Sequence, residues 1–273
     1  MPITNTRRVA AAIAVIGVSA FAVGCGSSSS TTPKTTSTTP PATTPATTPA
    51  TTNSSKPIVL GAASLTNVFP MIDPNAKFTF NGSGALATEI EQGAPADVYA
   101  AASPKDPAML LAMHLIDKPV PFATNTLVMV VPPSNPAHIT SVSDITKPGV
   151  KIVICNVTVP CGDYARTAFM NLGITGPAMK NVVSQATDVT QVVADVASGA
   201  ADVGFVYITD ADYAKGKVKT VKLPAKAMPG TIPEIAIVKK APDPAAARAF
   251  VALVLSAKGQ ATLKAAGFGP PPK

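Results

Sequence analysis

The sequence predicts an α/β protein built of two lobes, and three observations lead to this prediction. From residue 57 onward, short apolar runs typical of buried strands alternate with segments that have helical spacing and end at Gly or Pro. This alternation occurs in two successive series, one before and one after about residue 124. A last apolar run and two helical segments follow the second series, which indicates a return of the chain to the first lobe.

The first series alternates strictly between the two kinds of element. The expected elements are strand 58–62, a short helix after Ser64, strand 77–81, helix 85–92, strand 97–101 and helix 104–114. Gly93 and Pro95 end the second helix, and Pro104 suits the first turn of the third. Because short parallel strands joined by helices form one sheet, ligands are expected at the carboxyl ends of these strands.

The second series begins with a long apolar strand that stops at two prolines. The expected elements are strands 126–131 and 151–156, helix 162–172, a helix capped by Asp188 that runs through Ser198, strands 202–207, 218–223 and 235–238, and helices 244–256 and 258–266. Valines at helical spacing after Asp188 predict a buried helix face. We therefore expect the first lobe to comprise 57–124 plus 226–273 and the second lobe 125–225, with crossings near Thr124 and Lys226.

The first 24 residues have the layout of a secretory signal, because Arg7 and Arg8 precede an uncharged apolar run over 9–24. The run is too short for a comfortable membrane-spanning helix. Its end, AVGC, resembles the end of a bacterial lipoprotein signal, which would make Cys25 the lipidated first residue of the mature chain. The alternative is a plain secretory signal with an incidental cysteine. The expected location is the outer face of the cell membrane.

Residues 25–56 are expected to form a disordered tether. Almost all of them are Ser, Thr, Pro or Ala, and a Pro-Ala-Thr-Thr unit repeats between residues 41 and 52. Such a segment cannot bury a core. Its expected role is to hold the folded part clear of the membrane.

The folded part, 57–273, carries only a mild positive charge. Four of the 22 Lys and Arg precede it, which leaves 18 against 15 Asp and Glu. There is no cluster of basic residues and the chain contains no Trp. A nucleic-acid partner is therefore not expected.

Cys155 and Cys161 remain once Cys25 is assigned to lipid, and in an exported chain the simplest interpretation is a disulfide that closes a small loop. A redox role is less favoured, because the spacing is not C-x-x-C. A metal role has no support, because His114 and His138 are distant in sequence.

Two small-residue turns from strand to helix point to an anion. GAASLTN (61–67) and NGSGAL (81–86) each leave backbone N–H groups free at a helix start, where the helix dipole favours negative charge. Ser64 and Ser83 add hydroxyl donors. No Lys or Arg lies in either stretch, so neutral groups would hold the anion. The alternative is that both serines are ordinary N-caps.

Several motifs resemble those of the periplasmic molybdate-binding proteins of ABC importers. They keep the family's order along the chain: GAASLTN (61–67), GALATEIEQGAPADV (84–98), VPCGDYA (159–165), GFVYITDA (204–211) and AAGF (265–268). The resemblance covers essentially all of 57–268. It implies a type II periplasmic-binding-protein fold, with a mainly parallel sheet in each lobe and two crossover segments as the hinge.

The resemblance also implies a ligand set and partners. The carried-over contacts are the hydroxyls of Ser64, Ser83 and Tyr207 and the backbone N–H groups of Cys161 and Val189. The implied ligand is molybdate or tungstate, held without a direct metal ligand and without a cofactor, and the implied partners are the membrane permease and ATPase subunits of an importer. The stretch between Ser64 and the second strand is shorter than usual, which predicts a truncated first helix. Cys161 replaces a usual alanine.

Other functions stay open at this point. The same architecture could bind sulfate or phosphate, with cavity size deciding between anions. A secreted hydrolase with Ser83 as nucleophile is a different class, but Asn81 breaks the Gly-x-Ser-x-Gly pattern and no histidine lies in a matching segment. The alternation of strands and helices argues only weakly against a surface adhesin.

Overall fold

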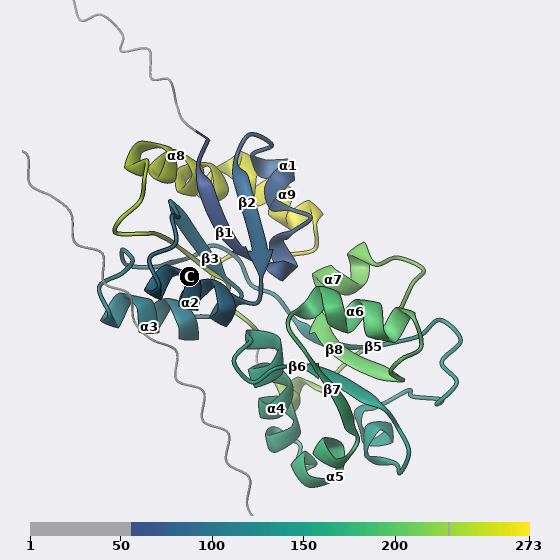
Figure 1. Ribbon diagram of the computed structural model, residues 1–273. Coiled ribbons are helices and arrows are strands. Elements are labelled where there is room, and N and C mark those ends of the chain that lie inside the picture. The colour runs from purple at the N-terminus through teal and green to yellow at the C-terminus, as the bar shows by residue number, and fades with distance from the viewer. Residues whose placement is uncertain (1–55, 229) are drawn as a thin grey trace, which may run out of the picture. The chain divides into compact units, whose positions relative to one another are not determined.

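The computed structural model of this chain describes residues 56–228 and 230–273. The expected signal segment, the lipid-bearing Cys25 and the tether up to residue 55 lie outside the described residues. The described part contains two five-stranded sheets, each flanked by helices (Figure 1). None of its helices is long and apolar enough to cross a membrane.

The first sheet has the strand order β2-β1-β3-β10-β4. Its strands are β1 (Ile58–Ala62), β2 (Lys77–Asn81), β3 (Val98–Ala101), β4 (Val120–Pro121) and β10 (Glu234–Ile237). β1 pairs in parallel with both β2 and β3, whereas β10 is antiparallel to β3 and β4. The strand β10 is therefore the late return that the sequence predicts.

Helices cover both faces of the first sheet, and strand residues alternate between them. The helices are η1 (Ala63–Leu65), α1 (Phe69–Ile72), α2 (Ser83–Glu91), α3 (Lys105–Ala112), α8 (Pro244–Leu255) and α9 (Ala257–Ala265). Leu60 and Tyr99 belong to the buried cluster that contains residues of α2 and α3. On the other face, the ring of Phe69 packs on Phe122 and Phe250 at centroid distances of 5.8 and 5.5 Å. The predicted truncation of the first helix is confirmed, because α1 has four residues.

The second sheet repeats this plan with the order β7-β6-β8-β5-β9. Its strands are β5 (Leu127–Val131), β6 (Ile152–Cys155), β7 (Val182–Ala186), β8 (Val203–Tyr207) and β9 (Lys219–Val221). β6 is parallel to β7 and β8, whereas β5 is antiparallel to β8 and β9. The expectation of mainly parallel sheets thus holds for three adjacent strands in each lobe, and two further strands extend each sheet through antiparallel pairing.

The helices of the second lobe are α4 (Pro160–Asn171), α5 (Thr175–Lys180), α6 (Val189–Ala197), α7 (Ile208–Tyr213), η2 (Val142–Thr146) and η3 (Ala225–Ala227). Asp188 caps α6 as predicted, since its Oδ1 accepts a hydrogen bond from the backbone N–H of Gln191 at 3.0 Å. Val192 and Val196 of the predicted stripe are fully buried. The sequence therefore marked both the start and the buried face of this helix.

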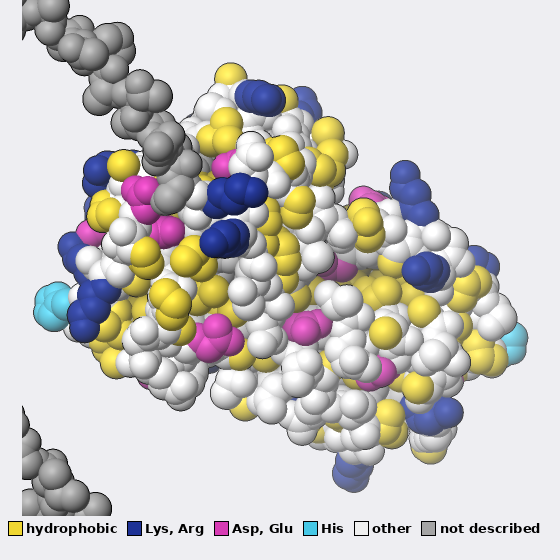
Figure 2. Space-filling model, turned by 45° about the horizontal axis from the view of Figure 1, so that its top comes forward, with side chains coloured by type: hydrophobic (Ala, Val, Ile, Leu, Met, Phe, Trp, Pro, Cys, Tyr) yellow, Lys and Arg dark blue, Asp and Glu magenta, His cyan; other side chains and the backbone are white. Residues whose placement is uncertain are grey.

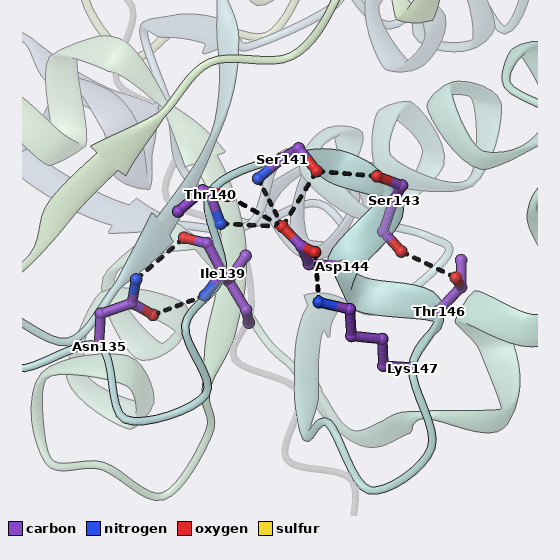
Figure 3. A network of polar contacts seen from close by, with 8 residues as sticks. All are labelled: Asn135, Ile139, Thr140, Ser141, Ser143, Asp144, Thr146 and Lys147. Atoms are coloured by element: carbon purple, nitrogen blue, oxygen red, sulfur yellow. Dashed lines mark hydrogen bonds and ion pairs between the residues drawn. The ribbon is translucent and has the colours of Figure 1, made fainter.

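The connection between β5 and β6 is ordered by its own polar groups (Figure 3). Asp144 Oδ2 accepts hydrogen bonds from the backbone N–H groups of Thr140 and Ser141 at 3.0 and 2.9 Å, and Lys147 Nζ lies 2.6 Å from Asp144 Oδ1. The bond to Lys147, followed by these N–H donors, holds the pKa of Asp144 well below its ordinary value. This loop belongs to the second lobe.

The predicted α/β class and the alternation of elements are confirmed, with boundaries shifted by one or two residues. The short elements β4, β7, α5 and α7 were not predicted. Two backbone bridges, Thr124 with Gly269 and Asn125 with Thr231, tie the segment around Thr124 to later parts of the chain. Asn171 of α4 donates to the carbonyl oxygen of Ala227 at 3.0 Å, so η3 packs with the second lobe.

Candidate functional site

Three parallel strands of each sheet end at one small cavity, whose volume is about 10 Å³. In the first lobe, the residues that line it lie at or just after the ends of β1, β2 and β3. In the second lobe, they follow β6 and β7 or end β8. The lining residues are Ala62, Ala63, Ser64, Asn81, Gly82, Ser83, Ala102, Val159, Pro160, Cys161, Asp188, Val189 and Tyr207. All five residues that the resemblance implies as ligand contacts therefore line the same cavity.

The first lobe contributes two buried serine hydroxyls. Ser83 is 1 % exposed, and its Oγ accepts a hydrogen bond from the backbone N–H of Ala102 at 3.1 Å. The hydroxyl of Tyr99 donates to the carbonyl oxygen of Ser83 at 2.9 Å, which fixes the start of α2 against β3. With one lone pair of Ser83 Oγ occupied, the O–H group remains a donor.

The interpretation of the two serines as N-caps is wrong. Ser83 is the first residue of α2, whose N-cap is Gly82, and no side chain caps the helix. Ser64 lies inside η1, whose N-cap is Ala62. Neither serine hydroxyl is used at the end of its own helix, so both stay available to the cavity.

The second lobe contributes two helix N-termini. Cys161 is the second residue of α4 and Val189 is the first residue of α6. Backbone N–H groups in the first turn of a helix have no acceptor within the helix, and the helix dipole adds partial positive charge there. Because both residues are nearly fully buried, these N–H groups would act in a medium of low polarity.

Tyr207 supplies the clearest sign of an absent partner. The residue is 2 % exposed, and its buried hydroxyl has no hydrogen-bond partner among the described residues. Burial raises the pKa of Tyr207 well above its ordinary value, so the hydroxyl keeps its proton and can donate it. A buried polar group without a partner costs roughly 1–3 kcal/mol, and a ligand acceptor in the cavity would remove that cost.

The loop that carries Cys161 is braced in two ways. Cys155 at the end of β6 is bonded to Cys161 by a disulfide. Arg166 Nη1 donates to the carbonyl oxygens of Cys155 and Gly162 at 3.1 and 3.0 Å, so it spans the same loop from α4. A second guanidinium nitrogen of Arg166 donates to Gln185 of β7 at 2.8 Å. These bonds hold the N-terminus of α4 against the edge of the sheet.

Among the described residues, no Lys, Arg or His lines the cavity. The charged residue in its lining is Asp188, which serves as the cap of α6. Outside the cavity, Lys105 of α3 and Asp163 of α4 form an ion pair between the lobes at 3.2 Å. Their side chains are 61 % and 40 % exposed, so this pair contributes at most about 1 kcal/mol.

Two further carboxyl groups near the junction have perturbed pKa values. Burial raises the pKa of Asp106, in the first turn of α3, to about 6, while the charge of Lys105 opposes this and that of Asp163 adds to it. Burial raises the pKa of Asp210 to about 7, although its carboxyl accepts the backbone N–H of Tyr207 at 3.0 Å. Neither residue lines the cavity.

The geometry does not favour the hydrolase alternative. Ser83 Oγ faces a backbone N–H group rather than a base, and the two histidines, His114 and His138, are exposed and do not line the cavity. Figure 2 shows the two histidine side chains, in cyan, at opposite edges of the view. The part of the chain that the structure describes also holds no group of three His, Cys, Asp or Glu side chains suited to a metal ion.

A cavity lined by hydroxyls and helix N-termini suits an anion that has several oxygens and no proton to donate. Its volume is near the minimum that admits a single water molecule, so in this arrangement of the lobes the cavity suits only a small ligand. On the face shown in Figure 2, Lys and Arg side chains (dark blue) are scattered and form no single patch. The sequence did not single out Ala102, although a run of small residues after β3 was a usable signal.

A family model described as "Bacterial extracellular solute-binding protein" matches residues 74–269. The molybdate-binding protein ModA of Mycobacterium tuberculosis is 40 % identical over 228 residues, which cover 78 % of this chain and 84 % of that protein.

Two solved structures share the fold at lower sequence identity. The periplasmic molybdate-binding protein of Azotobacter vinelandii is similar with a TM-score of 0.70 at 24 % identity, and the match covers 80 % of this chain and all of that one. The sulfate-binding protein SubI of Mycobacterium tuberculosis has a TM-score of 0.66 at 18 % identity, over 79 % of this chain and 87 % of that one. These two likenesses concern the fold alone.

Proposed function

Because this chain belongs to the bacterial extracellular solute-binding proteins and, among them, to the molybdate-binding proteins, we propose that it binds molybdate outside the cytoplasm and delivers it to an ABC importer. Proteins of this family are not enzymes, and the oxyanion is their transported ligand rather than a cofactor. Tungstate, which has the same shape and charge, is a second ligand under this proposal.

The observation that carries the proposal is the unpartnered hydroxyl of Tyr207 in a cavity that also presents serine hydroxyls and helix N-termini. Ser64 and Ser83 reach this cavity from the first lobe, and the N–H groups of Cys161 and Val189 reach it from the second. A tetrahedral dianion can accept a hydrogen bond from each of these groups and donates none. The ligand therefore accepts a hydrogen bond from the hydroxyl of Tyr207 and joins the two lobes.

Sulfate and phosphate are the competing ligands. Phosphate carries a proton near neutral pH and needs an acceptor, and the one carboxylate among the described lining residues, Asp188, already accepts the backbone N–H of Gln191 through Oδ1. Sulfate has the charge of molybdate but shorter bonds to oxygen, so its oxygens reach fewer of the fixed donors at once. Selection between these two anions then depends on the size of the cavity.

The proposal extends to the parts of the chain outside the described residues. Residues 1–24 act as the signal, Cys25 carries the lipid, and the tether through residue 56 holds the lobes at the outer face of the cell membrane. The partners there are the permease and ATPase subunits of the importer. We take the first lobe as 57–124 plus 226–273 and the second lobe as 125–225, with η3 at the boundary where the chain returns.

Calorimetric titration of the purified chain with molybdate, tungstate, sulfate and phosphate tests the proposal. We expect tight binding of molybdate and tungstate, and binding of sulfate and phosphate weaker by at least about 100-fold, a difference of roughly 2.7 kcal/mol. Preferred binding of sulfate would identify a different oxyanion carrier. Lack of binding to all four anions would refute the proposal.

A further inference from the structure

Two glycines that flank Ser83 lie directly against the second lobe. A β-carbon built on Gly84 would overlap the carbonyl oxygen of Thr158. A β-carbon on Gly82 would lie 2.7 Å from the carbonyl oxygen of Thr187 and 3.1 Å from a methyl group of Val159. Real β-carbons essentially never approach another atom within 3.0 Å, and at each position the carbonyl oxygen lies closer than that, so neither position has room for a side chain in this arrangement of the lobes.

The partners in these contacts belong to the other lobe. Gly82 and Gly84 stand at the start of α2 on the first sheet, whereas Thr158 and Val159 precede α4 and Thr187 precedes α6 on the second. Other closely packed glycines differ in this respect. A β-carbon on Gly204, for example, would meet side chains of its own lobe.

Backbone conformation does not explain the two glycines. Gly82 has φ −58° and ψ 136°, which any residue can adopt, and Gly84 lies within α2. Neither has a positive φ. Alanine at position 84 would even favour the helix. What excludes a side chain at these positions is the approach of the second lobe.

We propose that Gly82 and Gly84 set how closely the lobes approach and are therefore the residues that permit closure on the ligand. This inference rests on the proposed function, because it concerns how the same site closes. Ser83 lies between the two glycines and can face the N–H groups of Cys161 and Val189 only while both neighbouring positions lack a side chain. The closeness of approach in turn sets the size of the cavity, and thereby which oxyanion fits.

Gly84→Ala tests the inference, with Gly176→Ala as the matched control. Gly176 is also helical, in α5, and a β-carbon there would meet no atom within 4 Å. We expect Gly84→Ala to fold with an unchanged or higher melting temperature and to bind molybdate roughly ten-fold or more weakly, because closure now requires overlap. Gly176→Ala should bind like the parent. Gly82→Ala provides a second variant if Gly84→Ala fails to fold.

A second measurement does not depend on the ligand. The ion pair between Lys105 and Asp163 joins the lobes, so a zero-length carbodiimide can couple the amine to the carboxylate, and mass spectrometry of the digest reports the coupled peptides. In the purified full chain without ligand, Gly84→Ala should lower the yield of this cross-link several-fold relative to the parent and to Gly176→Ala.

The two measurements separate the inference from the proposed function. A parent protein that binds no oxyanion refutes the proposed function, while the cross-link still decides whether Gly84 controls the approach of the lobes. A parent that binds molybdate, together with a Gly84→Ala variant of equal affinity and equal cross-link yield, overturns the inference.

Discussion

The hydroxyl oxygen of Ser83 accepts a hydrogen bond from the backbone N–H of Ala102 across the ends of β2 and β3. This contact joins two strand-to-helix turns that are 19 residues apart in sequence. It occupies a lone pair of Ser83 Oγ and leaves the proton free, so the hydroxyl can donate toward the cavity. The contact also makes Ser83 both a structural and a proposed ligand-binding residue.

Substitution of the serines should separate these two roles. Ser64→Ala and Ser83→Ala should each weaken molybdate binding about ten-fold to a hundred-fold, because a hydrogen bond to an anion contributes about 1.5–3 kcal/mol. Ser83→Ala should also lower the free energy of unfolding by roughly 1–3 kcal/mol, since it leaves the buried N–H of Ala102 without a partner. Ser64→Ala should not, which makes it the control. Titration calorimetry and urea unfolding measure the two effects. Parent-like binding by both folded variants would place the site elsewhere.

Tyr207→Phe should move affinity and stability in opposite directions. Its hydroxyl is buried and unpartnered without ligand, so removal should leave the free energy of unfolding unchanged or raise it by up to about 1 kcal/mol. The same change should weaken molybdate binding about ten-fold or more, because the hydroxyl finds its acceptor in the ligand. Thermal unfolding without molybdate measures the change in stability, and the added stabilisation by molybdate measures the change in affinity. A clear loss of stability in the free protein would show that the hydroxyl already has a partner.

Loss of the disulfide should affect stability more than binding. Removing it with Cys155→Ala and Cys161→Ala together should cost roughly 2 kcal/mol in the chain-entropy model. Binding should fall less than in the serine variants, because the N–H of residue 161 survives and Arg166 still holds the loop through the carbonyl oxygens of Cys155 and Gly162. Mass spectrometry without reductant should find the parent two hydrogens lighter than the reduced chain. Two alkylatable thiols in freshly exported protein would contradict this.

Asp106 should make stability depend on pH. Its pKa is raised to about 6, mainly by burial, so the native state binds the proton more tightly than the unfolded chain. The free energy of unfolding should therefore fall as the pH rises from about 4 to about 6, by at most about 3 kcal/mol from this group. Asp106→Asn should flatten this part of the profile and stabilise the protein at neutral pH.

The measurement for Asp106 is urea unfolding of parent and variant across this range. Asp210, whose pKa is raised to about 7, contributes in the same direction in both proteins and cancels in the comparison. Identical profiles for parent and Asp106→Asn would show that the raised pKa has no effect on folding.

The anchor at Cys25 stays a prediction from sequence. Cys25→Ser should release the chain from the membrane fraction, because a single secretory signal without lipid leaves no attachment. Cell fractionation followed by immunoblotting measures the partition, and the change Cys155→Ser serves as a control for loss of a cysteine elsewhere. Unchanged membrane retention of the Cys25→Ser chain would refute lipidation at this residue.

Much of the fold could be predicted from local sequence patterns. Asp188 is a capping residue before a stripe of valines, and α6 starts there because capping and helical spacing act within a few residues. Strands β4 and β7 were missed for the opposite reason. β7, with the sequence VVSQA, is exposed over three of its five residues, so no apolar pattern marks it, and its strand conformation comes from pairing with β6. β4 is two residues long and is defined by β10.

The sequence by itself determined the order of strands and helices, the position of the return strand, and, through family resemblance, which five residues to examine. These follow from short-range patterns and from motifs that can be read in order. Only the tertiary structure decided that Tyr207 lacks a partner, that Ser83 and Ala102 share a hydrogen bond, and that Gly82 and Gly84 face Thr187 and Thr158. The Ser83–Ala102 bond joins the ends of two strands of one sheet, and the glycine contacts join the two lobes. Because these residues are far apart in sequence, no local pattern encodes their contacts.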